Sequence, residues 1–198
     1  MTDDVGIVNL ALIKLGNNTI GALTDQTDAA RKANAIYEMV RDAELEAHPW
    51  NFSIKRAELA ASTTTPDFEY DLQYPLPSDF LRLYEIFDYP VQFPTEDAPF
   101  AIENGGDDGT CILTNWTAPL KIRYVSKVTN PARFNPLFVQ ALACSLAMAL
   151  CDRLTQHQGK KADISKEYEM WLARARRIDA IQNPPIPLLE SSWVLSRL

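Results

Sequence analysis

The spacing of apolar residues changes twice along this chain, and this change constrains the fold more than any other feature. Over residues 3–15, and again from Thr27 to Ala47, apolar residues recur at the three- and four-residue intervals of an amphipathic helix. From Trp50 to Val128 that interval disappears, and short runs rich in aromatic and β-branched residues stand between proline or glycine clusters. The helical spacing then returns. The sequence therefore predicts helices on both sides of a β-rich module.

Capping residues mark the ends of the first two predicted helices. Thr2 or Asp3 is the N-cap candidate of the first helix, and Gly16 is its C-cap. The second helix follows Thr27 and ends before Pro49, because the residue before a proline resists the helical conformation.

Two further helices are predicted after the β-rich module. Asn130 and Pro131 supply an N-cap and a first-turn proline for a helix over 131–155. Its apolar residues cover most of the circumference, which is typical of a central helix contacted on several sides. The last helix is predicted over 161–182, with one apolar face.

These elements predict an α+β fold that is mainly helical. We expect an antiparallel bundle of four main helices (1–49 and 130–183), an inserted β-rich module (50–129) and an extended C-terminal tail (184–198). Strands are predicted over 71–76, 81–87, 100–102, 111–114 and 120–128, with a turn at 104–109.

Composition excludes several classes of protein. The 198 residues are 46% hydrophobic with 7 glycines and 13 prolines, which suits one or two globular domains and not a disordered or collagen-like chain. The longest near-apolar stretch, 141–150, is about half the length of a membrane span. No secretory signal is legible, and the 3 cysteines favour a reducing compartment. We therefore expect a soluble protein.

Charge is distributed very unevenly along the chain. Residues 1–57 carry 8 acids and 6 bases, residues 58–110 carry 12 acids and 1 base, and residues 111–198 carry 6 acids and 12 bases, giving −2, −11 and +6. The bases of the last helix are interleaved with acids, which favours a solvated, ion-paired helix over a nucleic-acid interface. Opposite charges on one small protein favour ordered self-association or docking to charged partners.

The sequence offers no recognisable catalytic or metal site. The 2 histidines, His48 and His157, lie in different segments, and the metal-binding Cys-x-x-Cys and His-x-x-x-His spacings do not occur. Glycine-rich phosphate loops and a Gly-x-Ser-x-Gly elbow are not found either. Cys144 and Cys151 fit core positions of one helix face. We predict a protein that is not an enzyme and has no cofactor.

Two segments invite a role in assembly. In the motif His48-Pro49-Trp50-Asn51-Phe52, proline ends the helix, and we expect Trp50 and Phe52 to pin the start of the β-rich module onto the bundle. The tail after Pro184 carries Trp193, Leu195 and Leu198 without a period that would bury them in the same core. This tail either folds back on its own subunit or docks into a neighbouring chain.

Several motifs, in order and at specific spacing, carry a resemblance to a known family. They cover the chain from about residue 5 to 180: Leu10 to Gly16; Ala30-Arg31, Tyr37, Val40-Arg41-Asp42, Leu45 and His48 to Phe52; Tyr74 to Asp79 with Leu81-Arg82; Ile122-Arg123-Tyr124; and Phe134 to Phe138 with Ala141-Leu142. In these motifs the chain resembles the tail tubular protein A family of short-tailed bacteriophages, the head-to-tail adaptors beneath the portal ring. The resemblance offers no catalytic residues to carry over.

The resemblance implies a structural virion protein, a connector in the phage tail that is assembled in the cytoplasm of the host bacterium. It implies a ring of about twelve copies, in which each subunit uses two different surfaces, between the portal protein and a nozzle protein of the tail tubular protein B type. Double-stranded DNA would pass through during genome ejection without sequence-specific binding, and no membrane is involved. Tail fibres are a further candidate partner.

Charge and packing suggest roles for particular residues. Trp193, Leu195 and Leu198 are candidate anchors to the portal or to an adjacent subunit. Arg31, Arg41 and Asp42 are either intersubunit contacts or local ion pairs.

The acids of the 58–110 module are candidates for the channel surface. Asp97, Glu103, Asp107 and Asp108 would form an acidic lumen or rim that repels DNA phosphates.

Two other classes of protein remain open on the sequence alone. The first is a cytoplasmic helical scaffold or regulatory binding protein without catalytic activity, which would show the same periodicity. The second is an enzyme with an unrecognised site.

Overall fold

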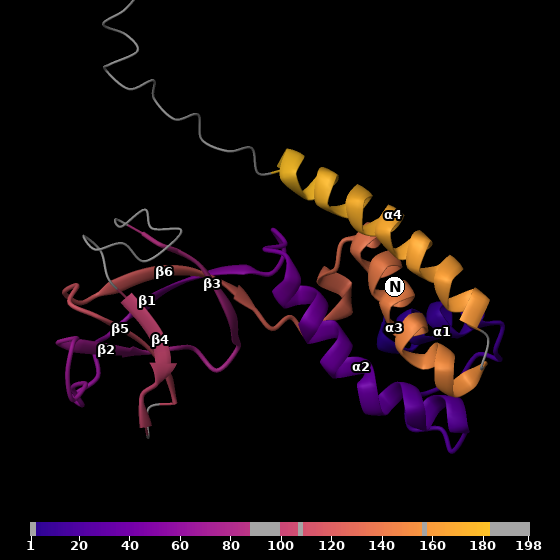
Figure 1. Cartoon of the computed structure of the whole chain (residues 1–198), viewed down its shortest axis with the longest axis horizontal. Coiled ribbons are helices and arrows are strands. Elements are labelled where there is room, and N and C mark those ends of the chain that lie inside the picture. Colours follow the sequence, from indigo (N-terminus) through magenta and orange to yellow (C-terminus); the bar gives the residue numbers. More distant parts are fainter. Residues whose placement is uncertain (1–2, 88–99, 107–108, 156–157, 183–198) are drawn as a thin grey trace, which may run out of the picture.

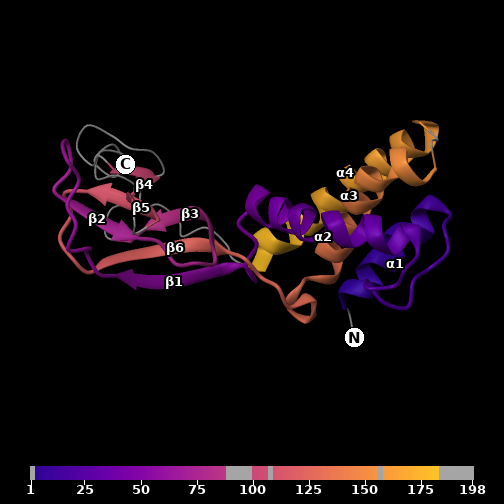
Figure 2. The same cartoon turned by 90° about the horizontal axis from the view of Figure 1, so that it is seen from below.

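The chain has two unlike halves, one built of helices and one of strands, arranged along a single long axis (Figures 1 and 2). The computed structural model describes residues 3–87, 100–106, 109–155 and 158–182. The helical half contains α1 (Asp4–Leu15), α2 (Asp28–Ala47), a short 3-10 helix (Pro131–Arg133), α3 (Pro136–Leu154) and α4 (Gln158–Gln182). The other half contains β1 (Ile54–Leu59), β2 (Leu72–Pro75), β3 (Phe80–Ile86), β4 (Phe100–Asn104), β5 (Thr110–Thr114) and β6 (Leu120–Ser126).

Within the described residues, the strands form two separate antiparallel sheets of three strands each, in the orders β1-β6-β3 and β2-β5-β4. In the first sheet, Ile54 of β1 lies opposite Val125 of β6. One apolar cluster takes side chains from both sheets, and its buried members are Leu59, Tyr74, Ile86, Ile112, Leu120, Ile122 and Tyr124. The sheets therefore bury a common core that is distinct from the helical core.

The predicted fold class, a mainly helical bundle with one inserted β-rich module, is wrong. The fold is mixed α+β, with 48% helix and 21% strand, and its strands divide between two sheets. Apolar runs and turn residues show where strands form, but not which strands pair, so the segment 50–129 reads as one module. The first strand was missed because Lys55, Arg56 and Glu58 make Ile54–Leu59 a charged segment with few β-branched residues.

Helix α3 is the centre of the helical half, as its all-round apolar surface predicts. It contacts α1, α2 and α4, and ten of its residues are buried. Cys144 and Cys151 are among these ten, and neither is joined in a disulfide bond. Burial raises the pKa of the Cys144 thiol, so it stays protonated and acts as a small apolar side chain. The prediction that both cysteines occupy the core is confirmed.

Most of the predicted helix ends are confirmed, but α4 begins at Gln158 and not at 161, and the predicted start of α3 is wrong. Asp3 caps α1 by accepting a hydrogen bond from the Gly6 backbone N at 2.7 Å, and Thr27 caps α2. The helix predicted from residue 131 begins five residues later, with Asn135 as its N-cap. Pro136 forces Asn135 into an extended conformation, so Asn130 caps only the short 3-10 helix.

Helix α3 is also long and apolar enough, by length and composition, to cross a membrane, and it is the one helix of the described residues that meets this test. More than half of its most apolar window is buried inside the fold. Its apolar surface is thus used largely by contacts with the other three helices.

Gly16 provides a test of the first helix end. Its φ of 74° is left-handed, and its N–H donates to the carbonyl of Ile13 at 2.9 Å. A side chain is strained in this conformation, so Gly16→Ala should lower the free energy of unfolding by about 1–2 kcal/mol. Urea unfolding measures this loss. Gly159→Ala is the matched control, because an added Cβ at Gly159 meets nothing within 4 Å and Gly159 lies in α4. The control should be neutral or stabilising.

Candidate functional site

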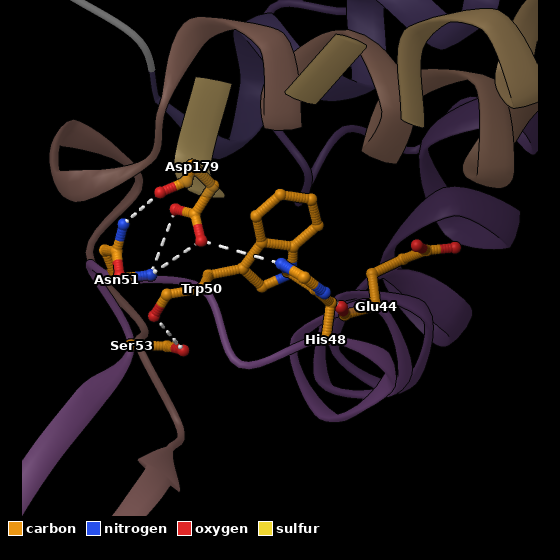
Figure 3. A network of polar contacts seen from close by, with 6 residues as sticks. All are labelled: Glu44, His48, Trp50, Asn51, Ser53 and Asp179. Carbon is orange, nitrogen blue, oxygen red and sulfur yellow. Dashed lines mark hydrogen bonds and ion pairs between the residues drawn. The ribbon is translucent and has the colours of Figure 1, made fainter. Parts of the chain in front are cut away.

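The two halves meet at a junction that the described part of the chain crosses twice. Residues 48–53 lead from α2 into β1, and residues 127–135 lead from β6 back to α3. The crossings are bonded to each other, because the backbone N and the Oγ of Ser126 donate to the Ser53 carbonyl at 2.8 and 2.7 Å. The Ser53 hydroxyl in turn donates to the Trp50 carbonyl at 2.8 Å (Figure 3). Both serines are buried, so these bonds are shielded from water.

Trp50 anchors the first crossing in the helical half. Its side chain is 1% exposed, and Nε1 donates to the Glu44 carbonyl of α2 at 3.0 Å. Pro49 ends α2 early enough to leave that carbonyl free for the indole. The indole also packs edge-on against Phe138 of α3, with the ring centroids 5.1 Å apart. The expectation that Trp50 pins the strands onto the helices is met by these contacts.

Further aromatic rings join the first crossing to the second. Phe52 contacts Phe134 and Phe138 at centroid distances of 5.7 and 5.2 Å, and Phe134 contacts Phe138 at 5.2 Å. We call Trp50, Phe52, Phe134 and Phe138 the junction cluster. Because Phe52 and Phe134 belong to different crossings, the cluster ties both to the start of α3.

Asp179 brings α4 into the junction. Its carboxylate, which is 5% exposed, accepts a hydrogen bond from the Asn51 backbone N at 3.1 Å. The Asn51 side chain donates to the Asp179 carbonyl at 2.7 Å, and His48 Nε2 lies 3.5 Å from the carboxylate (Figure 3). Burial lowers the pKa of His48, and the attraction of Asp179 recovers only part of that shift. His48 is therefore neutral at pH 7.

Arg41 and Asp42 form a local ion pair that also reaches the second crossing. Arg41 Nε donates to Asp42 Oδ1 at 2.9 Å, and the side chain of Arg41 is buried over the Tyr37 ring. The second carboxylate oxygen of Asp42 lies 2.8 Å from Lys127 Nζ, just after β6. Of the two alternatives for Arg41 and Asp42, these contacts favour the local ion pair.

Asp79, the last residue of the Tyr74 to Asp79 motif, fastens the strands near the junction. Its carboxylate accepts hydrogen bonds from Lys55 of β1 and from the Tyr124 hydroxyl of β6, the latter at 2.9 Å. Burial acts to raise the pKa of Asp79, but these two hydrogen bonds, the charge of Lys55 and a backbone hydrogen bond together hold that pKa below its usual value. Burial and Asp79 together raise the pKa of Tyr124 to about 12. The motif thus supplies a structural bond.

The remaining candidate residues lie away from the junction or outside the described residues. Glu103 is exposed on β4 and lines a polar hollow of about 420 Å³ together with the loop 64–70. Arg31 is exposed at the rim of an apolar groove between α2 and α3. Six further candidates lie outside the described residues: Asp97, Asp107, Asp108, Trp193, Leu195 and Leu198.

The junction has the chemistry of a structural joint. His48 and Asp179 resemble two members of a catalytic triad, but the nearby Ser53 hydroxyl donates to a backbone carbonyl and not to His48. Within the described residues, no group of three or more His, Cys, Asp or Glu side chains could hold a metal ion. The arrangement orients two parts of the chain.

The sequence reasoning missed Asp179, although a signal for it exists. The apolar face of α4 runs through Ile164, Tyr168, Leu172 and Ala175, and Asp179 comes four residues after Ala175. A carboxylate in the next buried position of such a stripe needs a partner in the fold. Ile178, the residue before Asp179, is 41% exposed and lies off this stripe.

No model of a known protein family matches the chain, and a search of curated proteins finds no relative. The function therefore has to be argued from the sequence and the structure.

Replacing Asp179 tests the bond between α4 and the junction. Asp179→Ala leaves the partly buried Asn51 N–H without its acceptor, which should lower the free energy of unfolding by about 1–3 kcal/mol. Amide exchange at Asn51 should also become faster. Asp163→Ala is the matched control, because Asp163 is exposed on the same helix, and this change should stay within about 0.5 kcal/mol of the wild type. Equal losses in the two variants would contradict the role of Asp179.

His48 should make stability depend on pH. Its pKa is lower in the folded chain than in the unfolded chain, so the unfolded chain binds the proton first as the pH falls. The free energy of unfolding should therefore decline below pH of about 6.5 and level off once folded His48 is also protonated. Urea unfolding between pH 7.5 and 5.5 should show a shallower decline for His48→Gln than for the wild type. His157→Gln serves as the control, and identical slopes for wild type and His48→Gln would refute the assignment.

Proposed function

We propose that this protein is a structural component of a short-tailed bacteriophage: the head-to-tail adaptor that forms a ring between the portal and the tail nozzle. The observation that carries the proposal is where the resembling motifs lie. His48 to Phe52 and Phe134 to Phe138 build the junction between the two halves, and Asp79 fastens the strands beside it. Because the resembling motifs stabilise a joint between the two halves and not a pocket, they support a structural function.

The shape of the chain suits a ring subunit. A closed ring needs two different surfaces on each subunit, held at a fixed angle so that successive copies close. Here a helical half and a strand half lie along one axis, and their junction is fastened by the junction cluster, by Asp179 and by Asp42 (Figures 1 and 2). Such a subunit would place its halves at different radii or heights of the ring.

The charge of the segment 58–110 supports a DNA channel. Residues 58–110 carry 12 acids and 1 base, and Glu103 of this segment is exposed. Repeated around a ring, these acids would line the lumen or its rim and repel DNA phosphates, so that DNA slides without sequence-specific binding. The idea fails if basic side chains line the bore of the assembled ring.

The proposed ring has several partners. They are further copies of this chain, the portal protein above, and below it a nozzle protein of the tail tubular protein B type, with tail fibres as a further candidate. The ring would be part of the virion after assembly in the host cytoplasm. The segment 184–198, with Trp193, Leu195 and Leu198, is the candidate anchor to the portal or to the next subunit.

Electron microscopy with portal rings tests the proposal. The purified chain is mixed with rings of the portal protein encoded in the same genome, and class averages should show a ring of added density on one portal face. A variant lacking residues 184–198 should lose this attachment while keeping its circular dichroism spectrum.

Two results would contradict the proposal or its anchor. If the full chain leaves portals bare and forms a defined oligomer by itself, the scaffold alternative is favoured. If the shortened chain attaches as well as the full one, the anchor lies elsewhere.

A further inference from the structure

The helical half carries a surface groove with an apolar floor and a basic rim. It lies between α2 and α3, has a volume of about 430 Å³, and has Ile36, Met39 and Leu150 in its floor. Met39 is 68% exposed, a large apolar exposure for a surface side chain. Arg31 and Arg153 stand at the rim, and among the described residues neither side chain forms an ion pair. The groove thus offers apolar surface beside two free cations.

The strand half carries the complementary feature on the loop that leads into β2. Phe68 is 80% exposed, the most exposed of the large apolar side chains in the described residues. It stands between two exposed acids, Asp67 and Glu69. We call Asp67, Phe68 and Glu69 the acidic aromatic tip.

The loop that presents the tip is fixed, and its backbone is strained. The Asp71 N–H donates to Asn115 Oδ1 at 2.8 Å, and the Tyr70 N–H donates to the Phe68 carbonyl at 2.9 Å. Glu69 has a φ of 71°, which costs a side-chain-bearing residue about 1–2 kcal/mol. Backbone strain of this kind persists where surrounding contacts hold the conformation, and it is typical of functional sites. Here the strained turn projects the Phe68 ring into solvent.

The tip and the groove lie at opposite ends of the molecule. The loop before β2 is at the end of the strand half that points away from the helices, and the N-terminal part of α2 is at the far end of the helical half (Figures 1 and 2). One chain therefore cannot bring its own tip to its own groove without unfolding. Contact between them requires two copies.

We propose that the acidic aromatic tip of one copy docks into the groove between α2 and α3 of the next copy. Phe68 covers Met39 and Ile36, while Asp67 faces Arg153 and Glu69 faces Arg31. The contact joins two different surfaces, so it propagates from copy to copy and does not close a symmetric dimer. This contact is the subunit interface of the proposed ring, so the inference rests on the proposed function.

The size of the contact sets the conditions of the test. A buried phenylalanine removes about 150–250 Å² of surface from water, well below the roughly 1,000 Å² of a stable interface. The contact is therefore weak between two free chains and becomes persistent only when ring closure or a portal holds the copies together. Cross-linking at high protein concentration detects such a contact.

Cysteine cross-linking tests the geometry directly. Glu69→Cys and Met39→Cys are made as separate variants, while the native Cys111, Cys144 and Cys151 are buried and shielded from oxidation. Mild oxidation of the mixture should yield a covalent dimer at least tenfold faster than either variant alone. Ile13→Cys, at a residue that is 60% exposed on α1, replaces Met39→Cys in the control mixture. A rate equal to this control, or dimers of one variant with itself at the rate of the mixture, would overturn the proposal.

Exchanging two charges across the contact distinguishes loss of the contact from loss of folding. Added to the Met39→Cys chain, Arg153→Glu should slow cross-linking to Glu69→Cys at least fivefold, and Asp67→Arg on the Glu69→Cys chain should restore the rate. Restoration cannot come from an unfolded variant, and its failure would refute the assigned pairing. Cross-linking without attachment to portals would keep this interface and reject the phage adaptor. If rings form on portals but this cross-link does not, the phage adaptor is kept and this interface is rejected.

Discussion

The packing of four aromatic rings where the chain crosses between its halves is the contact on which the rest of the structure depends. Trp50 and Phe52 come from the first crossing, Phe134 ends the 3-10 helix of the second, and Phe138 lies in the first turn of α3. Buried aromatic rings remove more surface from water than other side chains, so the cluster favours one arrangement of the crossings over a pair of free linkers. The halves are thereby held as one body and not as two tethered domains.

Polar bonds around the cluster set the angle that apolar packing alone would leave loosely defined. Asp179 reaches the first crossing from α4, and Asp42 connects α2 with Lys127 after the second. Asp179 is buried and Asp42 is partly buried, and a buried carboxylate is costly unless its partners are in place, so these bonds are sensitive to geometry. An assembly built from many copies needs this property, because a small error in the angle of each subunit accumulates around a ring.

The sequence predicted local structure well and long-range structure poorly. The helix ends at Gly16 and Ala47 depend on neighbouring residues, and periodicity and caps indicated both. The division into two sheets depends on strand pairing between distant segments, such as β1 with β6, which no local pattern encodes. At the junction, Trp50 and Phe52 were indicated by their position after Pro49. The place of Asp179 in the apolar stripe of α4 indicates its burial but not its partner, because Asn51 lies 128 residues away.

The pairing of Ser53 with Ser126 has a mechanical consequence. Strands β1 and β6 leave and rejoin the helical half at neighbouring points and run side by side along the long axis of the molecule (Figure 2). A pull at the far end of the strand half would divide between two covalent connections, and neither strand would slide past the other. The hydrogen bonds between β1 and β6 would therefore carry little shear. Tension along the axis would be borne first by the two peptide backbones and only then by the weaker contacts of the fold.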